Sequence, residues 1–510
     1  MHAAQTPANA SQGYICCMHS NRTHQRSDLV RIAIHAMSEH GLQPEFSDRV
    51  EQQLATITGT GVDSDPSIHD LTGLMWCSID NDDSMDLDQL TVSEALPNGN
   101  VRLWVAIADV DALVQRDSPI DQHASTNTTS VYTSARIFPM LPERLSTDLT
   151  SLNPHQDRLA MVTEMVFNAD ASLAGSTVYR AKVRNQAKLA YDAVSAWLTG
   201  QADLPAAAAA VPGLDQQLRT QDSLAQQLRA RRHGEGSLEF ESFQPRVTFD
   251  GERVAEIHLQ EHNRARQLIE EVMIATNTCT AHYLAGQGVA SLRRVVRSPE
   301  RWLRIVAVAK EYGEILPAEP DSKALEDFLA KRRRVDPLRF PDLSLVIVKL
   351  MGRGEYVLEV PGTEPIGHFG LAVTDYTHST APNRRFPDLI TARLLKAALA
   401  GKSAPYSNAE LDALAVHCTR QEDAAQKVER QMRKSEAALL LETRIGEQFD
   451  AIVTGNAADG AWVRLLNPPA EGKVVRGINA LKVGDKLRVK LLSTSVDRGF
   501  IDFESMGLRT

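Results

Sequence analysis

The spacing of hydrophobic residues predicts strands early in the chain and helices later. Apolar residues alternate with a period of two over 101–114, and again over 161–183 on both sides of a polar turn. Over 262–285 they recur at intervals of three and four, which is typical of an amphipathic helix. The same helical spacing over 27–57 is broken at Gly41 and Pro44, so two short helices are expected there.

Further helices are predicted over 186–232, with an alanine-rich interruption, and over 298–350 and 386–400. Ser407 and Glu410 then form a capping-box pattern ahead of a long helix that runs to about residue 441. After residue 444, glycines separate five short apolar stretches. Five short strands within about 60 residues suggest a small Greek-key barrel of the OB type.

Composition indicates a reduced, cytoplasmic globular protein. The chain has 510 residues, 43% of them hydrophobic, and no apolar run approaches the roughly 18 residues that a membrane span needs. The chain has five cysteines, an odd number, and their spacing matches neither a disulfide framework nor a zinc-binding motif. The net charge of −10 argues against a nucleic-acid partner, although basic clusters occur locally. The largest, Lys331–Arg334, is either such a contact surface or a solvated helix end.

The stretch from Asp80 to Asp88 contains five carboxylates within nine residues. Like charges this dense are unfavourable unless a cation neutralises them, and hard divalent ions prefer oxygen ligands. Two such ions about 4 Å apart can activate water at a phosphate. A solvated acidic loop is the alternative, whereas the spacing of a calcium-binding EF-hand loop is missing.

This acidic stretch resembles a signature of the RNB catalytic domain of the ribonuclease II family, which reads Asp, five residues, Asp, one residue, Asp, Asp. Asp80, Asp86 and Asp88 match the first three positions. Gln89 stands at the fourth, where its amide oxygen can still bind a metal but adds no charge. The resemblance implies that these four residues hold Mg²⁺ or Mn²⁺ and that the three aspartates are catalytic.

A second and more specific resemblance covers residues 368–372 and 376–389. Arg384 takes the position of the family's catalytic arginine, and a guanidinium there can clamp phosphate oxygens. Asn383 replaces a residue that is usually apolar in the family. Arg385 is expected to contact substrate, unless it pairs with a structural carboxylate such as Asp388.

Three more residues are matched by position to the family's substrate contacts. Tyr132 and Phe240 correspond to two rings that stack on RNA bases, and stacking suits any sequence because every base has a π-face. Glu270 corresponds to a carboxylate that faces the sugar of the 3′-terminal nucleotide, with Glu271 as the alternative exposed partner. Core packing and a solvated helix face are the structural alternatives.

Together these matches identify an α/β (α+β) RNB catalytic domain with a C-terminal OB barrel of the S-one type. They imply a monomeric, metal-dependent 3′-to-5′ exoribonuclease that acts on single-stranded RNA; the alternative is a catalytically silent RNA-binding regulator. The barrel's basic residues would contact phosphates if exposed: Lys473, Arg476, Lys486 and Arg488. The expected segments are a disordered tail at 1–26, a helical lead-in at 27–66, the catalytic domain at 67–442 and the barrel at 443–510.

Overall fold

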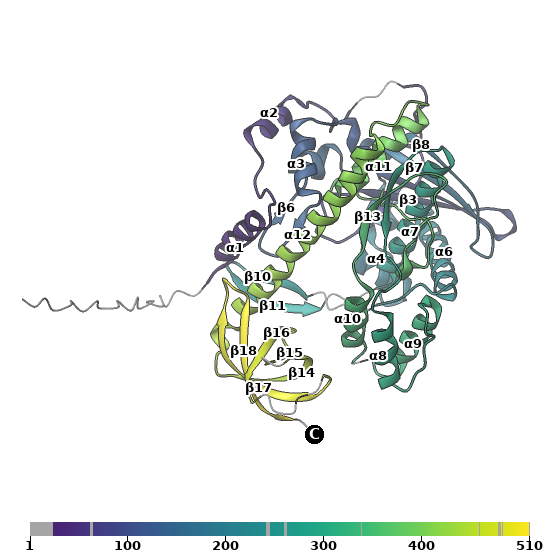
Figure 1. Cartoon of the computed structure of the whole chain (residues 1–510). Coiled ribbons are helices and arrows are strands. Elements are labelled where there is room, and N and C mark those ends of the chain that lie inside the picture. Colours follow the sequence, from purple (N-terminus) through teal and green to yellow (C-terminus); the bar gives the residue numbers. More distant parts are fainter. Residues whose placement is uncertain are drawn as a thin grey trace, which may run out of the picture.

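A seven-stranded mixed sheet lies on the right of the molecule in Figure 1, away from the yellow barrel. The computed structural model describes residues 24–508 apart from 62–64, 241–244, 260–262, 338, 458–459, 478–480 and 482. Two neighbouring pairs in the sheet, β1–β8 and β2–β9, are parallel, and the others are antiparallel. In spatial order the strands are β1 (His69–Asp70), β8 (Leu173–Arg184), β7 (Asp157–Phe167), β4 (Val101–Ala108), β3 (Gln89–Ala95), β2 (Cys77–Asp80) and β9 (Ala187–Ala190).

Helices cover both faces of this sheet, as expected for the predicted α/β class. Leu103 of β4 belongs to the hydrophobic cluster on one face and Trp104 to the cluster on the other, because neighbouring side chains of a strand point to opposite faces. The first cluster is closed by α4 (Tyr191–Leu198), α6 (Leu214–Gly234) and α7 (Arg264–Gly286). The second is closed by α3 (Pro119–Asn127), α11 (Phe386–Leu399) and the first half of α12 (Asn408–Leu441).

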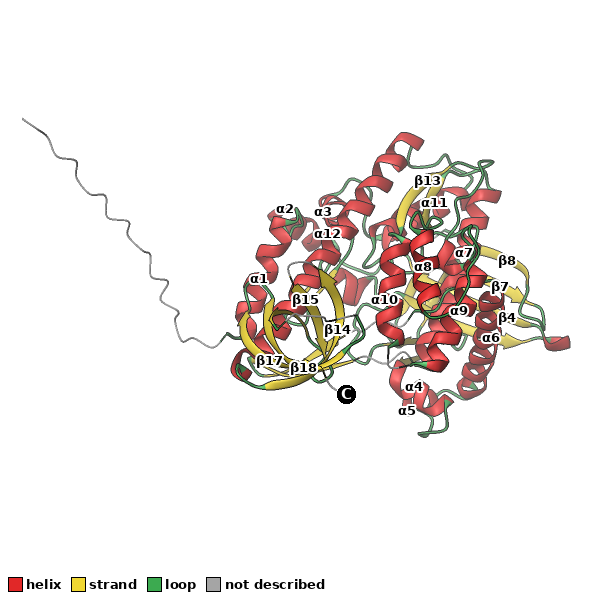
Figure 2. Ribbon diagram, turned by 60° about the horizontal axis from the view of Figure 1, so that its bottom comes forward, coloured by secondary structure: helices red, strands yellow, loops and turns green. Residues whose placement is uncertain are grey.

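The 34-residue helix α12 joins the sheet to the barrel (Figure 1). It begins with the predicted capping box, in which Ser407 and Glu410 satisfy each other's backbone amides. At 1.5 Å per residue the helix is about 50 Å long. Its early residues, such as Leu411, pack in the core of the sheet, and later ones, such as Val428, pack with α1 (Arg26–Glu39) and the barrel. Figure 2 shows α1 beside the yellow strands of the barrel.

The predicted C-terminal barrel is confirmed. Its five strands close in the order β14 (Gln448–Ala457), β15 (Gly460–Leu465), β16 (Glu471–Arg476), β18 (Phe500–Leu508) and β17 (Lys486–Ser495). The nearly buried Arg464 donates to Asp342 at 3.0 Å, which ties β15 to α10 (Phe340–Met351). That helix forms a small bundle with α8 (Trp302–Glu311) and α9 (Ser322–Val335). Among the described helices, none has the length and apolar character of a membrane span.

Two local features differ from the sequence expectation. The predicted helical region 186–232 begins instead with the edge strand β9, because Ala187 and Leu189 alternate into the α6–α7 side of the core. The hairpin of β10 (Pro245–Asp250) and β11 (Arg253–Leu259) was not predicted. The remaining elements are short: α2 (Asp48–Thr56), β5 (Val131–Tyr132), β6 (Ile137–Phe138), α5 (Ala206–Ala209), β12 (Ser291–Val295) and β13 (Glu355–Glu359). Of the predicted N-terminal tail, residues 1–23 lie outside the described residues.

Candidate active site

The acidic stretch forms the connection between β2 and β3. Asp80 ends β2, and its Oδ1 accepts hydrogen bonds from the amide of Asn81 at 2.7 Å and the hydroxyl of Ser84 at 2.9 Å. Asp88 immediately precedes β3, is only 2% exposed, and accepts the amide of Asn383 at 3.0 Å. The two strand ends therefore fix the ends of the acidic loop, and Asp86 lies between them.

Burial makes the carboxylates of Asp86 and Asp88 unfavourable as anions. Loss of solvation is the main cause that raises both pKa values, that of Asp88 to about 8. Each carboxylate also raises the pKa of a neighbour: Asp80 acts on Asp86, and Asp86 on Asp88. The positive charge of Arg384 opposes these effects. Without a cation these two carboxyls therefore tend to keep their protons, and a cation bound beside them would favour their ionised forms.

The second matching segment supplies Arg384. Its Nε lies 3.6 Å from Oδ2 of Asp88, and its side chain is 44% exposed, so the guanidinium is accessible to a ligand. The backbone is fixed because the carbonyl of Arg384 accepts the amide of Ser130 at 3.0 Å and the hydroxyl of Thr129 at 3.1 Å. The cation is thus held beside the acidic loop by a segment more than 250 residues earlier in the chain.

Arg385 takes the structural role that was the alternative for it. Its Nη2 donates to Oδ1 of Asp388 at 2.7 Å and to the hydroxyl of Thr380 at 3.3 Å. Asp388 is fully buried near the start of α11 and also accepts the amide of Ala381. The neighbouring arginines therefore differ: Arg384 faces the acidic loop, and Arg385 fastens the segment to α11.

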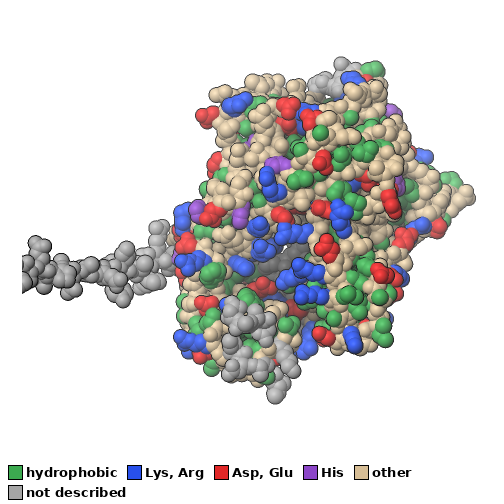
Figure 3. All heavy atoms as spheres, in the orientation of Figure 1, with side chains coloured by type: hydrophobic (Ala, Val, Ile, Leu, Met, Phe, Trp, Pro, Cys, Tyr) green, Lys and Arg blue, Asp and Glu red, His purple; other side chains and the backbone are tan. Residues whose placement is uncertain are grey.

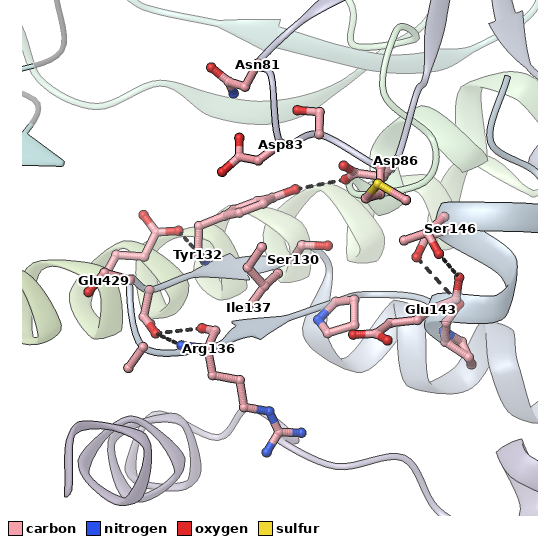
Figure 4. A pocket seen from close by; sticks show the side chains of 18 of the residues that line it. Asn81, Asp83, Asp86, Ser130, Tyr132, Arg136, Ile137, Glu143, Ser146 and Glu429 are labelled. Carbon is pink, nitrogen blue, oxygen red and sulfur yellow. Dashed lines mark hydrogen bonds between the residues drawn. The ribbon is translucent and has the colours of Figure 1, made fainter. Parts of the chain in front are cut away.

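Tyr132 lies on the hairpin of β5 and β6, next to the acidic loop (Figure 4). Its hydroxyl donates to Oδ2 of Asp86 at 3.3 Å, and its ring is partly open, with the residue 40% exposed. Its backbone amide donates to Glu429 at 3.1 Å, and the amide of Ser134 donates to Glu436 at 3.3 Å. Two glutamates of α12 thus hold the hairpin that presents the ring.

A cavity of about 1380 Å³ opens from this point. Asp83 to Asp86 and Tyr132 line one part of it, as Figure 4 shows. Residues of the N-terminal helical region, including Arg26 and Leu54, line another part, together with Arg433 of α12. The volume exceeds the roughly 300 Å³ at the lower end for small-molecule sites and is compatible with an extended ligand.

Two other predicted contacts lie outside this cavity. Phe240 is half-buried and packs against the hydrophobic cluster of α8, α9 and α10. Ring pairs among the described residues do not include one between Tyr132 and Phe240. Glu270 is exposed on α7, whereas Glu271 is buried and pairs with Arg232. The suggestion that Glu271 is the exposed partner is therefore wrong.

Gln89 differs in orientation from its neighbour Asp88. It is the first residue of β3 and pairs with Ile107, so it lies on the α6–α7 face of the sheet, as Thr91 does. Asp88 instead binds the loop of Asn383. Because the two side chains leave the chain in opposite directions, they do not form an adjacent pair of ligands.

The donor set fits a hard divalent cation in chemistry and charge. Asp80, Asp86 and Asp88 offer only oxygen atoms; Asp86 is half-buried, Asp88 is buried, and loss of solvation raises the pKa of both. No three His, Cys, Asp or Glu side chains of the described residues are grouped closely enough to hold an ion by themselves. Mg²⁺ does not need such a cage, because it commonly binds one or two carboxylates together with water and substrate phosphates.

Several residues that shape the site carry no recognisable signal in their local sequence. Lys188 of β9 donates to the carbonyl of Ser84 at 2.6 Å, and Arg266 of α7 donates to Oδ1 of Asn81 at 2.8 Å. Both hold the acidic loop from elements more than 100 residues away. Glu429 and Glu436 are seven residues apart, which places them on one helical face, but their partner hairpin could not be inferred from that spacing.

Comparison with known proteins agrees with this geometry. Residues 68–401 match the RNB domain, and residues 447–505 match the RNase II-type exonuclease C-terminal S1 domain. The first match covers more than half of the chain, so the chain belongs to the RNB-domain family. The class defined by the fold and the acidic site is thus that of RNB proteins with a C-terminal S1 barrel.

Individual relatives are proteins called ribonuclease R. That of Aquifex aeolicus (strain VF5) is 31% identical over 471 residues, and the match covers 85% of this chain and 64% of the relative. The chain thus spans a little under two thirds of that relative's length. A structure of Mycoplasma genitalium RNase R with ribose methylated single-stranded RNA has a TM-score of 0.85 at 24% identity, covering 94% of this chain and 78% of that one. The same enzyme with double-stranded RNA has a TM-score of 0.82 at 25% identity, covering 94% and 83%.

Proposed function

We propose that this protein is a metal-dependent 3′-to-5′ exoribonuclease that hydrolyses single-stranded RNA to 5′-nucleoside monophosphates. The observation that carries the proposal is the arrangement of four side chains: half-buried Asp86 and the ring of Tyr132 line one cavity, and the accessible Arg384 lies between Asp86 and the buried Asp88 in charge contact with both. Membership of the RNB family and relatives named ribonuclease R support RNA as the substrate class. The RNA-bound structures of Mycoplasma genitalium RNase R support it as well.

In this proposal Asp80, Asp86 and Asp88 hold Mg²⁺ or Mn²⁺. When bound, the ion supplies an activated water and charge for the leaving oxygen. Gln89, the fourth residue of the signature, is not included among these ligands, because its side chain lies on the Ile107 face of the sheet, opposite to that of Asp88. A divalent ion beside Asp86 and Asp88 would favour the ionised forms of both carboxyls, which desolvation disfavours and Arg384 alone does not restore.

The chain's own residues bind and orient the substrate. The guanidinium of Arg384 contacts the scissile phosphate and stabilises the negative charge that develops on its oxygens. Tyr132 stacks on a base near the 3′ end; Asp86 holds its hydroxyl, and Glu429 holds its backbone amide. Glu270 reads the ribose of the terminal nucleotide by accepting from its hydroxyls, which distinguishes RNA from DNA. The role of Phe240 as a second stacking ring stays a prediction, as do the monomeric state and the cytoplasmic location.

The test is degradation of a 5′-labelled, unstructured RNA of about 30 nucleotides, long enough to occupy a cavity and a barrel. Reactions contain Mg²⁺, Mn²⁺ or EDTA, and a deoxyribose strand of the same sequence runs in parallel. We expect a metal-dependent ladder on RNA that collapses to a short 5′-labelled product. The Asp88→Asn variant, purified in the same way, controls for contaminating nucleases. RNA that stays intact but shifts in a binding gel would instead indicate a silent RNA-binding protein.

A further inference from the structure

Two neighbouring buried residues fix the backbone of the acidic loop around Asp86. The hydroxyl of Ser151 accepts the amide of Leu87 at 3.0 Å and donates to the carbonyl of Met85 at 2.8 Å. The amide of Leu152 donates to the carbonyl of Leu87 at 2.9 Å. These three bonds hold the residues on either side of Asp86, the half-buried carboxylate that lines the cavity.

Ser151 is fully buried, so its hydroxyl binds the protein and not a ligand. It cannot reach RNA in the hollow that Figure 3 shows, around which Lys and Arg side chains gather. Its single proton can be given to the carbonyl of Met85 or to Oδ1 of Asn153, which lies 3.0 Å away. In both cases the hydroxyl oxygen still accepts from Leu87, whose amide belongs to the peptide bond that follows Asp86.

The residue before Ser151 connects the same segment with Asp88. Oγ1 of Thr150 lies 2.5 Å from Oδ1 of Asn383, and the backbone amide of Asn383 donates to Asp88 at 3.0 Å. Asn383 is 1% exposed and stands where the family usually has an apolar residue. In this chain a buried polar pair therefore joins Thr150 to the segment that carries Arg384.

The position of Ser151 is itself fixed by a turn of π-helix and a buried arginine. The π-helix Arg144–Leu149 ends at Thr150, whose amide donates to the carbonyl of Leu145 at 3.0 Å, five residues earlier. Arg158 of β7 is only 6% exposed and donates to the carbonyl of Ser151 at 3.0 Å. A buried guanidinium is unfavourable unless its N–H groups are bonded, so Arg158 and this segment hold each other in place.

The direction of the Asp86 carboxylate depends mainly on its backbone. The hydrogen bond that its side chain accepts from Tyr132 is long, at 3.3 Å, whereas the bonds of Ser151 are 2.8 and 3.0 Å. Mg²⁺ demands a near-ideal octahedral geometry, so a ligand that turns away is lost to the ion. Residues that orient metal ligands typically change metal affinity or activity by about 10–100-fold when they are replaced.

We propose that Ser151 is a positioning residue that directs the carboxylate of Asp86 toward the metal ion. This inference rests on the proposed function, because it assigns that carboxylate to a divalent cation. Ser151 contacts neither substrate nor ion and acts through the backbone of residues 85 and 87. Its removal should therefore weaken metal binding although every ligand is still present.

The test compares Ser151→Ala with Ser93→Ala in the full chain. Ser93 is also buried, but its hydroxyl donates to the carbonyl of Gln217 on α6 at 3.0 Å. Bound Mn²⁺ is measured by electron paramagnetic resonance, with and without a short ribose-methylated RNA, and thermal melts compare the stability of the two variants. We expect the affinity for Mn²⁺ to fall at least about tenfold in Ser151→Ala and less than about twofold in Ser93→Ala. RNA affinity in EDTA should stay that of wild type in both.

Ser151→Cys carries the test if the alanine variant does not fold. A thiol is a weak donor and a weak acceptor, so we expect an affinity for Mn²⁺ that is lower than that of wild type. Wild-type affinity in the Ser151 variants, or an equal loss in Ser93→Ala, overturns the inference, and so does a wild-type protein that binds no Mn²⁺. Hydrolysis is measured separately. A protein that loses Mn²⁺ on replacement of Ser151 but releases no nucleotides as wild type would refute the proposed activity and leave the role of Ser151 standing.

Discussion

The hydroxyl of Tyr132 donates a hydrogen bond to Oδ2 of Asp86 at 3.3 Å, which links the ring of the β5–β6 hairpin directly to the acidic loop. Burial and the neighbouring carboxylate of Asp86 both raise the pKa of the Tyr132 hydroxyl, so it stays a donor at neutral pH. Residues 46 positions apart in sequence are thereby joined into one unit. The ring of Tyr132 should nevertheless contribute to RNA binding, and the carboxylate of Asp86 to hydrolysis.

Replacing Tyr132 tests this separation. In Tyr132→Ala the stacking surface is lost, and stacking on one base is worth about 1–3 kcal/mol. We therefore expect the labelled end product to become longer, because short fragments are released before the last cleavages. In Tyr132→Phe only the hydrogen bond to Asp86 is removed, so the end-product length should stay that of wild type. A sequencing gel of the products provides the measurement, and an unchanged ladder in Tyr132→Ala would rule out a stacking role.

Asp88→Asn should remove activity while keeping the fold and the affinity for RNA. Asparagine retains the oxygen that accepts the amide of Asn383, but it cannot supply a negative charge to a metal ion. We expect turnover to fall by at least about a hundredfold, the scale seen when one electrostatic contact to a transition state is lost. Single-turnover rates and anisotropy report the two quantities independently. Normal turnover in this variant would refute the role of Asp88 in holding metal.

Substitutions at the two adjacent arginines should affect different properties: turnover at Arg384 and stability at Arg385. Arg384 is accessible beside Asp88, and Arg384→Lys loses the bidentate contact that a guanidinium can make with phosphate. Turnover should therefore fall by about 10²–10³-fold, with little change in the free energy of unfolding. Arg385→Met leaves the carboxylate of Asp388 buried without its partner, which should cost about 3–5 kcal/mol of unfolding free energy. Kinetics and urea denaturation of both variants give the comparison. If both variants lose only turnover, Arg385 is not the structural residue that its contacts indicate.

Local sequence patterns anticipated most of the elements but few of the contacts. The period-two pattern around Leu103 and the capping box of Ser407 predicted β4 and the start of α12, because these signals depend on neighbouring residues alone. The motif around Arg384 identified a candidate cation beside the acidic loop. In contrast, the periodicity predicted a helix at 187–190, where pairing with β2 produces a strand. Tertiary pairing overrode the local preference there.

The sequence predicted only those site residues that belong to a recognisable motif. Lys188 and Arg266 hold the acidic loop as single basic residues on distant elements, and nothing in their local sequence distinguishes them from surface charges. Phe240 illustrates the opposite case, since a position matched to a stacking ring lies against the α8–α10 cluster. Such contacts depend on how α7, α12 and the sheet pack together, which no short pattern encodes.

Glu436 should make stability depend on pH between about 4.5 and 7. Burial raises the pKa of this carboxyl to about 7, and only hydrogen bonds from Ser134 and the charge of Arg433 oppose the rise. The folded protein therefore keeps the proton over a range in which the unfolded chain, with a pKa near 4.5, has lost it. Consequently the contribution of Glu436 to stability falls as pH rises through this window and is constant above about pH 7. The loss amounts to at most about 3 kcal/mol, at 1.36 kcal/mol per pKa unit.

The variant Glu436→Gln isolates this effect, because glutamine resembles the protonated acid and can still accept the amide of Ser134. Urea unfolding at pH 5 and pH 8 should show nearly equal stability of variant and wild type at pH 5, and a more stable variant at pH 8. The difference in unfolding free energy between the two proteins removes the contributions of all other titrating groups, because both proteins share them. If the difference is the same at both pH values, Glu436 titrates normally in the folded state, and the Tyr132 hairpin rests on an ionised carboxylate rather than a protonated one.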